Sequence, residues 1–259
     1  MGSIAHLCFF LFSKLFIKSF FSSVLFFVCL VVLYHSKTNH VADVTEAKIK
    51  IYYHNVNSSN SSLEGLADNI LKSKADIICL VEVSPDIDIF LRKKLSNYSH
   101  TYSIPRNDNF GFSIFSKHKF NMHYVHEAQG IPVYVKLYFE SINIKFYLIH
   151  LPPPLWKEAW VTQEETLSLI TNEINKNRML PFLVVGDMNM TPSSSIFLDF
   201  YKKLQPKYDS GKNFFLGTWP SFLPKYFSLP IDHVFSDERF DIEQGSSAGS
   251  DHRSFIIRM

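Results

Sequence analysis

Acidic, amide and imidazole side chains recur in this sequence where apolar, strand-like runs begin or end. The positions are Asn55, Glu82, His150, Asp187, Asn189, Asp232, Asp251 and His252. Taken singly, each has an ordinary explanation, because Asp-x-Asn and Ser-Asp-His are common in turns and helix caps. Active sites often form in the segments that follow strands, so the recurrence predicts that these side chains share one site.

Several of these residues offer hard oxygen atoms. Asp187 and Asn189 are two positions apart and project to the same side of an extended segment. Together with Glu82 and Asn55 they form a set of carboxylate and amide ligands, which suits Mg²⁺ better than zinc. The sequence therefore predicts a magnesium site.

Two imidazoles extend this chemistry. His150 and His252 can transfer protons and stabilise charge. No Ser or Cys nucleophile motif accompanies them. A metal with imidazole and no side-chain nucleophile indicates direct attack by water on a phosphate ester.

The chain between these residues alternates strand and helix signals. Strands are expected at 49–54, 76–83, 111–116, 133–139, 142–149, 182–185, 231–235 and 255–257, and helices at 63–71, 86–95, 158–176 and 194–204. Mixed strands with interspersed helices predict an α/β sandwich, in which two mixed sheets pack face to face under flanking helices. The runs 133–139 and 142–149 predict a hairpin.

The polar motifs occur in a recognisable order along the chain. They are Tyr53-His54-Asn55-Val56, Asp76 to Val83, Gly111 to Lys117, Ile149-His150-Leu151, Gly186-Asp187-Met188-Asn189, Ile231-Asp232-His233 and Gly249 to Arg253. In this order and spacing the chain resembles the endonuclease/exonuclease/phosphatase superfamily over Lys48 to Met259. This group contains pancreatic deoxyribonuclease, abasic-site endonucleases, neutral sphingomyelinases and inositol-phosphate phosphatases. The resemblance implies a four-layered α/β sandwich and a divalent-metal phosphoesterase.

The resemblance also implies a metal site. Glu82 would be the principal ligand of Mg²⁺, with Mn²⁺ as the alternative ion. Asn55 and Asp251 would lie close to the metal.

The remaining matched residues would act on water and phosphate. His252 would be the general base, and Asp232 would orient it. Asp187 and Asn189 would hold the nucleophile and the phosphate, while His150 would stabilise charge on the phosphoryl oxygens.

The chain departs from the family pattern in two respects. Phe112 stands where the family often has Asn, so one phosphate contact is missing. The catalytic Tyr of abasic-site enzymes has no motif here, with Tyr124 and Tyr134 as candidates, which weakens a DNA-repair function.

The N-terminal segment differs in composition from the rest of the chain. Of 25 Phe residues, eight lie in the first 27 positions, and no charged residue occurs between Ser19 and Ser36. This run is about long enough to cross a ~30 Å hydrocarbon core. The predicted organisation is a tail at 1–14, a transmembrane anchor at 15–35, a linker at 36–47 and a catalytic domain at 48–259.

The anchor has competing interpretations. A cleaved signal peptide would need a small-residue site, for which only Ala42 is available, and a lipoprotein signal at Cys29 is opposed by Val28. A buried core helix is the third alternative. A basic, acid-free stub usually stays in the cytosol, so a single-pass topology predicts a catalytic domain outside the cytoplasm, on the periplasmic side.

The domain's charge bears on its substrate. The whole chain has 26 Lys+Arg and 24 Asp+Glu, and removal of residues 1–35 leaves 24 against 24. A neutral domain argues against nucleic acid as the substrate, although a nuclease stays an alternative to a sphingomyelinase-like phospholipid phosphodiesterase. An inactive, membrane-tethered binding scaffold is the non-enzyme alternative, and no obligate protein partner is expected.

An aromatic stretch, 214–227, precedes Asp232. Its ordinary interpretation is core packing, and the alternative is contact with lipid or an apolar substrate group. Other short motifs resemble a bacterial branch of the family that carries N-terminal membrane segments. They are Pro152-Pro153-Pro154, Thr218-Trp219-Pro220 and Leu229-Pro230.

Overall fold

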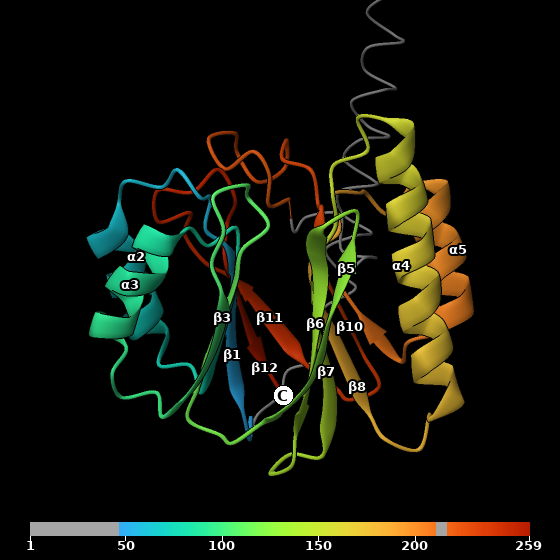
Figure 1. The fold of residues 1–259 in the computed structure, drawn as a ribbon, viewed down its shortest axis with the longest axis horizontal. Coiled ribbons are helices and arrows are strands. Elements are labelled where there is room, and N and C mark those ends of the chain that lie inside the picture. The colour runs from blue at the N-terminus through green and yellow to red at the C-terminus, as the bar shows by residue number, and fades with distance from the viewer. Residues whose placement is uncertain (1–46, 211–216) are drawn as a thin grey trace, which may run out of the picture. The chain divides into compact units, whose positions relative to one another are not determined.

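Two six-stranded sheets pack against each other in the computed structural model, which describes residues 47–210 and 217–259 (Figure 1). The first sheet has the order β11 (Asp241–Gln244), β12 (Phe255–Arg258), β1 (Lys50–Asn55), β2 (Ile77–Val81), β4 (Phe112–Ser116) and β3 (His100–Ile104). The second has the order β5 (Asn121–Ala128), β6 (Ile131–Phe139), β7 (Ile144–His150), β8 (Phe182–Asp187), β10 (Asp232–Ser236) and β9 (Tyr208–Asp209).

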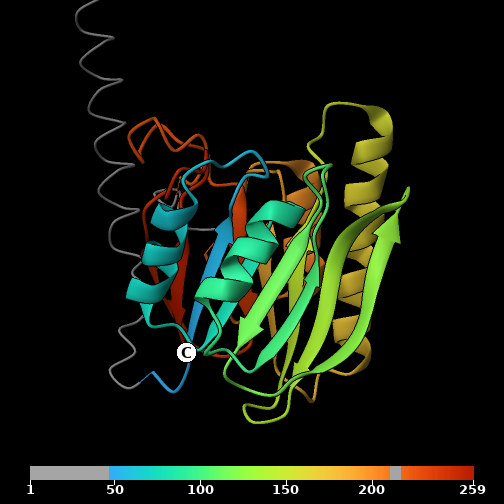
Figure 2. The same ribbon diagram turned by 60° about the vertical axis from the view of Figure 1, so that its left-hand side comes forward.

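Helices cover the outer face of each sheet. The helices α2 (Leu63–Ser73) and α3 (Pro85–Lys94) lie on the first sheet, and α4 (Lys157–Lys176) and α5 (Ser195–Leu204) lie on the second (Figures 1 and 2). The layer order is therefore helix, sheet, sheet, helix. This is the α/β sandwich that the alternating signals predict.

Strand alternation divides the apolar side chains between the layers. In β2, Cys79 and Val81 join the core between the sheets, whereas Ile78 and Leu80 pack under the helices. Because both faces are buried, the strand is apolar at every position. The predicted strand at 76–83 has this composition for that reason.

A parallel pair lies in the middle of each sheet and fixes where the polar residues meet. β1 pairs with β2 in parallel, and β7 pairs with β8 in parallel. The carboxyl ends of these four strands lie at the same end of the sandwich, because Asn55 hydrogen-bonds to Glu82 and Asp187, and His150 lies 3.6 Å from Glu82. The residues at or just beyond those ends therefore gather at one edge of both sheets.

The sequence predicts most of these elements but not all. The hairpin of β6 and β7 is confirmed, with Phe139 paired to Ile144. The strands β3, β5, β9 and β11 have no separate prediction, because all four are edge strands and lack a fully apolar run.

The predicted membrane anchor, residues 15–35, lies outside the described residues, as do the tail 1–14 and most of the linker 36–47. Within the described part of the chain, no helix combines the length and the apolar character needed to cross a bilayer.

Candidate active site

A cavity of about 590 Å³ opens at the edge where the four parallel strands end. Six of the eight predicted site residues line it, namely Glu82, His150, Asp187, Asn189, Asp251 and His252. The other two, Asn55 and Asp232, are buried directly behind these residues and hydrogen-bond to them. The structure therefore brings all eight together.

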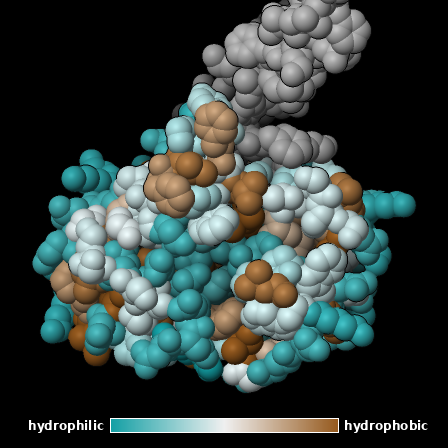
Figure 3. Space-filling model, turned by 90° about the horizontal axis from the view of Figure 1, so that it is seen from above, coloured by the Kyte–Doolittle hydropathy of each residue, from teal (hydrophilic) through white to brown (hydrophobic). Residues whose placement is uncertain are grey.

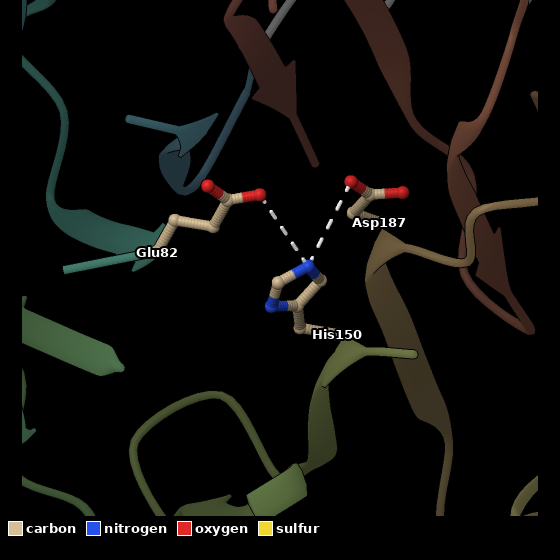
Figure 4. A group of neighbouring side chains, drawn as sticks. All are labelled: Glu82, His150 and Asp187. Atoms are coloured by element: carbon tan, nitrogen blue, oxygen red, sulfur yellow. Dashed lines mark ion pairs between the residues drawn. The ribbon is translucent and has the colours of Figure 1, made fainter. Parts of the chain in front are cut away.

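Two carboxylates and an imidazole form the centre of the site (Figure 4). His150 Nε2 lies 3.6 Å from Glu82 Oε1 and 4.0 Å from Asp187 Oδ2. Asn55 Nδ2 donates to the same two oxygens, at 2.7 Å to Glu82 and 3.0 Å to Asp187. Glu82 and Asp187 come from different sheets, so the cluster joins the two halves of the sandwich.

The position of Glu82 depends on an unusual backbone conformation. Simple alternation along β2 would place Glu82 on the side of Ile78 and Leu80, under the helices. Its φ is instead 58°, in the left-handed region that non-glycine residues seldom adopt. This turn directs the carboxylate between the sheets, where it meets Asn55.

A second group extends from the cavity into the core. His252 Nδ1 lies 2.9 Å from Asp232 Oδ2, and the hydroxyl of Tyr53 donates to Asp232 Oδ1 at 2.6 Å. His252 Nε2 faces the cavity, 3.7 Å from Asp187 Oδ2. Asp232 thus fixes the ring through Nδ1, and Nε2 lies 3.4 Å from Asn55 Nδ2 on the side of the metal-ligand candidates.

Burial and mutual repulsion control the ionisation of this group. Burial raises the pKa of Asp187, and the nearby Asp232 raises it further. Burial also raises the pKa of Glu82. For His252, burial opposes protonation, but Asp232 and Asp187 outweigh it and raise the pKa to about 10. The carboxylates therefore repel one another, and a cation bound between them would stabilise their charged forms.

The donor set fits a divalent cation. Two groups in the described part of the chain could hold a metal ion, Glu82 with His150 and Asp187, and Asp187 with Asp232 and His252. No Lys or Arg is among the described residues that line the cavity, so no side-chain cation other than His252 balances the carboxylates. Carboxylate oxygens are hard ligands, which Mg²⁺ and Mn²⁺ favour.

His150 is held in an aromatic and largely apolar pocket. Phe110 stacks on its ring at 5.0 Å, and Phe112 contacts it edge-on at 6.5 Å. Burial lowers the pKa of His150 to about 3, so the ring is neutral at physiological pH. Phe112, which stands where the family often has Asn, thus supports the imidazole.

Asp251 and Asn189 line the cavity but already have partners. Asp251 accepts hydrogen bonds from Asn57 Nδ2 at 2.8 Å and from Trp219 Nε1 at 2.9 Å. Asn189 donates from its backbone to Asp187 Oδ1 at 2.8 Å and from Nδ2 to the carbonyl of Leu151 at 2.8 Å.

Sequence reasoning missed several residues that position the site. Tyr53, Asn57, Phe110 and Trp219 each contact a predicted site residue. Only Tyr53 carried a usable signal, because it lies two positions before Asn55 in the same strand and so shares its face. The others come from loops, from which Phe110 and Trp219 line the cavity and Asn57 contacts Asp251.

The structure separates the alternatives that the sequence leaves open for two groups of aromatic residues. Tyr124 and Tyr134, the candidates for a catalytic Tyr, do not line the cavity, because they lie on the outer side of the second sheet, where Tyr124 donates to Glu173 of α4. In the stretch 214–227, of which residues 214–216 lie outside the described part of the chain, Phe222 and Phe227 are exposed, so core packing is wrong for these two side chains.

Comparisons with known structures support the fold. An AP endonuclease from Archaeoglobus fulgidus superimposes with a TM-score of 0.64 at 15% identity, covering 81% of this chain and 98% of the other. An endonuclease/exonuclease/phosphatase from Beutenbergia cavernae gives 0.63 at 15% identity, covering 83% and 72%. Truncated TDP2 from Caenorhabditis elegans gives 0.60 at 13% identity, covering 81% and 96%. A search of curated protein sequences finds no match.

The fold and the acidic, His-containing cavity define a metal-dependent hydrolase of phosphate esters. The sequence model of the Endonuclease/Exonuclease/phosphatase family matches residues 52–252. The chain belongs to this family.

Proposed function

We propose that this protein hydrolyses a phosphate ester by direct attack of water, with His252 as the general base. The observation that carries the proposal is the pairing of His252 Nδ1 with Asp232 at 2.9 Å, which leaves Nε2 directed at the cavity beside Asp187. A base needs its free nitrogen within reach of the nucleophile and its other nitrogen fixed by a carboxylate.

A divalent cation would complete the site. Glu82 would be its principal ligand, with Asp187 and Asn55 alongside, and Mg²⁺ or Mn²⁺ would suit these oxygens. The ion would polarise the phosphoryl group. Asn55 turns Nδ2 toward Glu82 and Asp187, while its Oδ1 accepts from the backbone N–H of Asn57 at 3.1 Å. The amide would therefore have to rotate to offer Oδ1 to a cation.

The charge of a bound cation would also change the base. The carboxylates Asp232 and Asp187 hold the pKa of His252 high, at about 10, so a protonated ring predominates without a counter-charge. Positive charge beside Asp187 opposes that effect and lowers the pKa of His252. His252 could then accept the proton of the attacking water at neutral pH.

The other site residues would bind and orient the phosphate. His150 is neutral and its Nε2 faces Glu82 and Asp187, so it would donate a hydrogen bond to a phosphoryl oxygen. Asp187 and Asn189 would position the water and the phosphate. Asp251 would support the metal region through its neighbours Asn57 and Trp219.

The two candidate substrates, nucleic acid and phospholipid, differ in how much positive charge the protein needs in order to bind them. Nucleic acids are bound through Lys and Arg contacts to successive phosphates. The absence of both residue types from the described lining of the cavity counts against a nuclease. The inactive scaffold has little support, because the buried carboxylates would be costly to retain without a cation or a reaction.

The test uses the full chain and bis(4-nitrophenyl) phosphate, a soluble phosphodiester. We expect hydrolysis with Mg²⁺, loss of activity with EDTA, and recovery with excess Mg²⁺ or Mn²⁺. His252→Ala should reduce kcat at least a hundredfold. His126→Gln, a histidine outside the cavity, is the matched control and should retain activity. Metal-independent turnover, or an active His252→Ala variant, would overturn the proposal.

We further propose that residues 15–35 anchor the protein in a membrane, and that the catalytic domain, 48–259, lies outside the cytoplasm. The support is the uncharged run from Ser19 to Ser36, followed by a polar linker. Protease added to intact cells or spheroplasts should digest the catalytic domain. Protection of the domain until the membrane is opened would contradict this topology.

A further inference from the structure

Two loops carry exposed apolar side chains next to the mouth of the cavity. One loop joins β7 to α4 and carries Leu155 and Trp156, and the other, residues 217–229, precedes β10. Their exposed apolar residues, here called the apolar rim, are Leu155 (77% exposed), Trp156 (50%), Phe222 (82%), Phe227 (74%) and Leu229 (46%). Hydrophobic groups stand beside a hydrophilic centre on this end of the molecule (Figure 3).

The apolar rim is continuous with the site. Leu155, Trp156 and Leu229 line the same cavity as Glu82 and His252. Phe222 and Phe227 lie on the same loop as Leu229. If the phosphate of a substrate lies beside His252, the rest of that substrate would contact apolar side chains at the mouth of the cavity.

The 217–229 loop is anchored on the catalytic segment. Arg253, the residue after His252, donates to the carbonyls of Gly217, Ser221 and Leu223 and to the hydroxyl of Ser228. The backbone N–H of Ser221 donates to the carbonyl of Asp251 at 2.7 Å. The guanidinium of Arg253 therefore makes its hydrogen bonds to the 217–229 loop and fixes the backbone that carries Phe222 and Phe227.

The charges around the cavity favour an uncharged or zwitterionic surface over a polyanion. The described lining contains the acids Glu82, Asp108, Asp187 and Asp251 and neither Lys nor Arg. Arg106 is itself paired with Asp108, at 2.9 and 3.0 Å. On the loop, Lys225 lies 5.2 Å from the ring centre of Tyr226. Aromatic residues with a neighbouring Lys are typical of segments at a membrane interface.

We propose that the apolar rim docks on a lipid bilayer and that the substrate is a phosphodiester lipid of that bilayer. The proposal rests on the hydrolytic function proposed above and names its substrate class. The rim side chains would enter the interface, and the phosphate of one lipid would rise into the cavity. Water forms the new bond to phosphorus, the bond from phosphorus to one ester oxygen breaks, and that oxygen leaves as an alcohol with a proton.

Tryptophan fluorescence tests the docking without relying on catalysis. All three Trp residues, 156, 160 and 219, lie in the catalytic domain, so the N-terminal segment contributes no signal. The full chain is reconstituted in phosphatidylcholine vesicles with brominated acyl chains, which quench nearby Trp residues. We expect quenching that falls in Trp156→Phe and in Phe222→Ser/Phe227→Ser. Unquenched emission in the wild type, or equal quenching in the Phe222→Ser/Phe227→Ser variant, overturns the docking.

Activity on two substrates separates this inference from the proposed function. The Phe222→Ser/Phe227→Ser variant should hydrolyse phosphatidylcholine vesicles at least tenfold more slowly than the wild type. It should cleave bis(4-nitrophenyl) phosphate within twofold of the wild-type rate, since neither Phe lines the cavity. Leu198→Ser, which removes an exposed apolar residue from α5, is the control and should change neither rate.

The outcomes are distinguishable. A wild type that cleaves the soluble diester but no vesicle lipid refutes the lipid substrate and leaves the proposed function standing. A wild type that cleaves neither with Mg²⁺ present refutes both. Equal loss of both activities in the Phe222→Ser/Phe227→Ser variant shows damage to the fold or the site, and contradicts a rim that acts only in lipid docking.

Discussion

The hydroxyl of Tyr53 donates a 2.6 Å hydrogen bond to Asp232, the carboxylate that pairs with His252. The two residues come from different sheets, Tyr53 from β1 and Asp232 from β10. The contact thus crosses the core and fixes the second oxygen of the carboxylate, while the first holds the imidazole. Tyr53 is a positioning residue, since it touches the base only through Asp232.

Tyr53→Phe is expected to lower kcat about tenfold, because hydrogen bonds to charged groups contribute about 1.5–3 kcal/mol. KM should change little, since Tyr53 does not line the cavity. Steady-state kinetics on a soluble diester measure both values. Tyr52→Phe is the matched control, since Tyr52 lies on the opposite face of β1 and hydrogen-bonds to His54 and Asn69. A rise in KM with unchanged kcat would contradict the role of Tyr53.

Asp187→Asn should lower the pKa of His252 in the metal-free protein. The charge of Asp187 is one of the causes that raise this pKa to about 10, after the charge of Asp232. NMR titration of the imidazole measures the shift, and titration calorimetry should show weaker Mg²⁺ binding. Asp199→Asn on α5, where the carboxylate pairs with exposed Lys203, is the control. An unchanged pKa would show that Asp187 does not act on the base.

Acid should destabilise the fold partly through His233. Burial lowers the pKa of His233 from 6.5 to about 4, while its Nε2 donates to the carbonyl of Met190. Between these values the unfolded chain binds a proton that the folded protein does not, so stability falls as pH decreases from 6.5 to 4. The loss is on the order of 3 kcal/mol.

His233→Gln keeps a donor for Met190 and removes the titration. Urea unfolding at several pH values should show a smaller loss of stability on acidification than in the wild type. His126→Gln, outside the cavity, serves as the matched substitution. Identical pH dependence in the His233→Gln variant and the wild type would rule out this contribution.

Gly186→Ala should disrupt the site through the backbone. An added Cβ would meet the carbonyl oxygen of Ile149 at 1.9 Å, where β7 and β8 approach each other. β7 ends at His150 and β8 ends at Asp187. If the added methyl group pushed the two strands apart, both side chains would move. We expect a loss of about 3 kcal/mol or more in unfolding free energy and loss of activity.

Gly130→Ala provides the comparison for that substitution. Nothing lies within 4 Å of a Cβ added there, although φ is +79°. Its cost should be limited to about 1 kcal/mol of backbone strain. Similar unfolding free energies for the two variants would show that the contact with Ile149 is relieved at little cost.

The sequence by itself determined most of the helices and strands, and which side chains were present to do chemistry. Apolar runs such as 182–185 predict buried strands because strands covered on both faces must be apolar throughout. The polar residues that follow them, such as Asp187 and His150, stand out against those runs. Their order along the chain was sufficient to indicate the family and the class of reaction.

Only the tertiary structure decided how these residues meet. The left-handed φ of Glu82 reverses the side that strand alternation predicts, and no local pattern encodes that turn. The contact of Tyr53 with Asp232 joins residues 179 positions apart. Phe222 and Phe227 are exposed on a loop whose carbonyls at Ser221 and Leu223 accept hydrogen bonds from Arg253, 32 and 30 positions along the chain. The amino-acid composition of a loop does not show whether an aromatic side chain is buried or exposed. That depends on where hydrogen bonds from the rest of the fold hold the backbone of the loop.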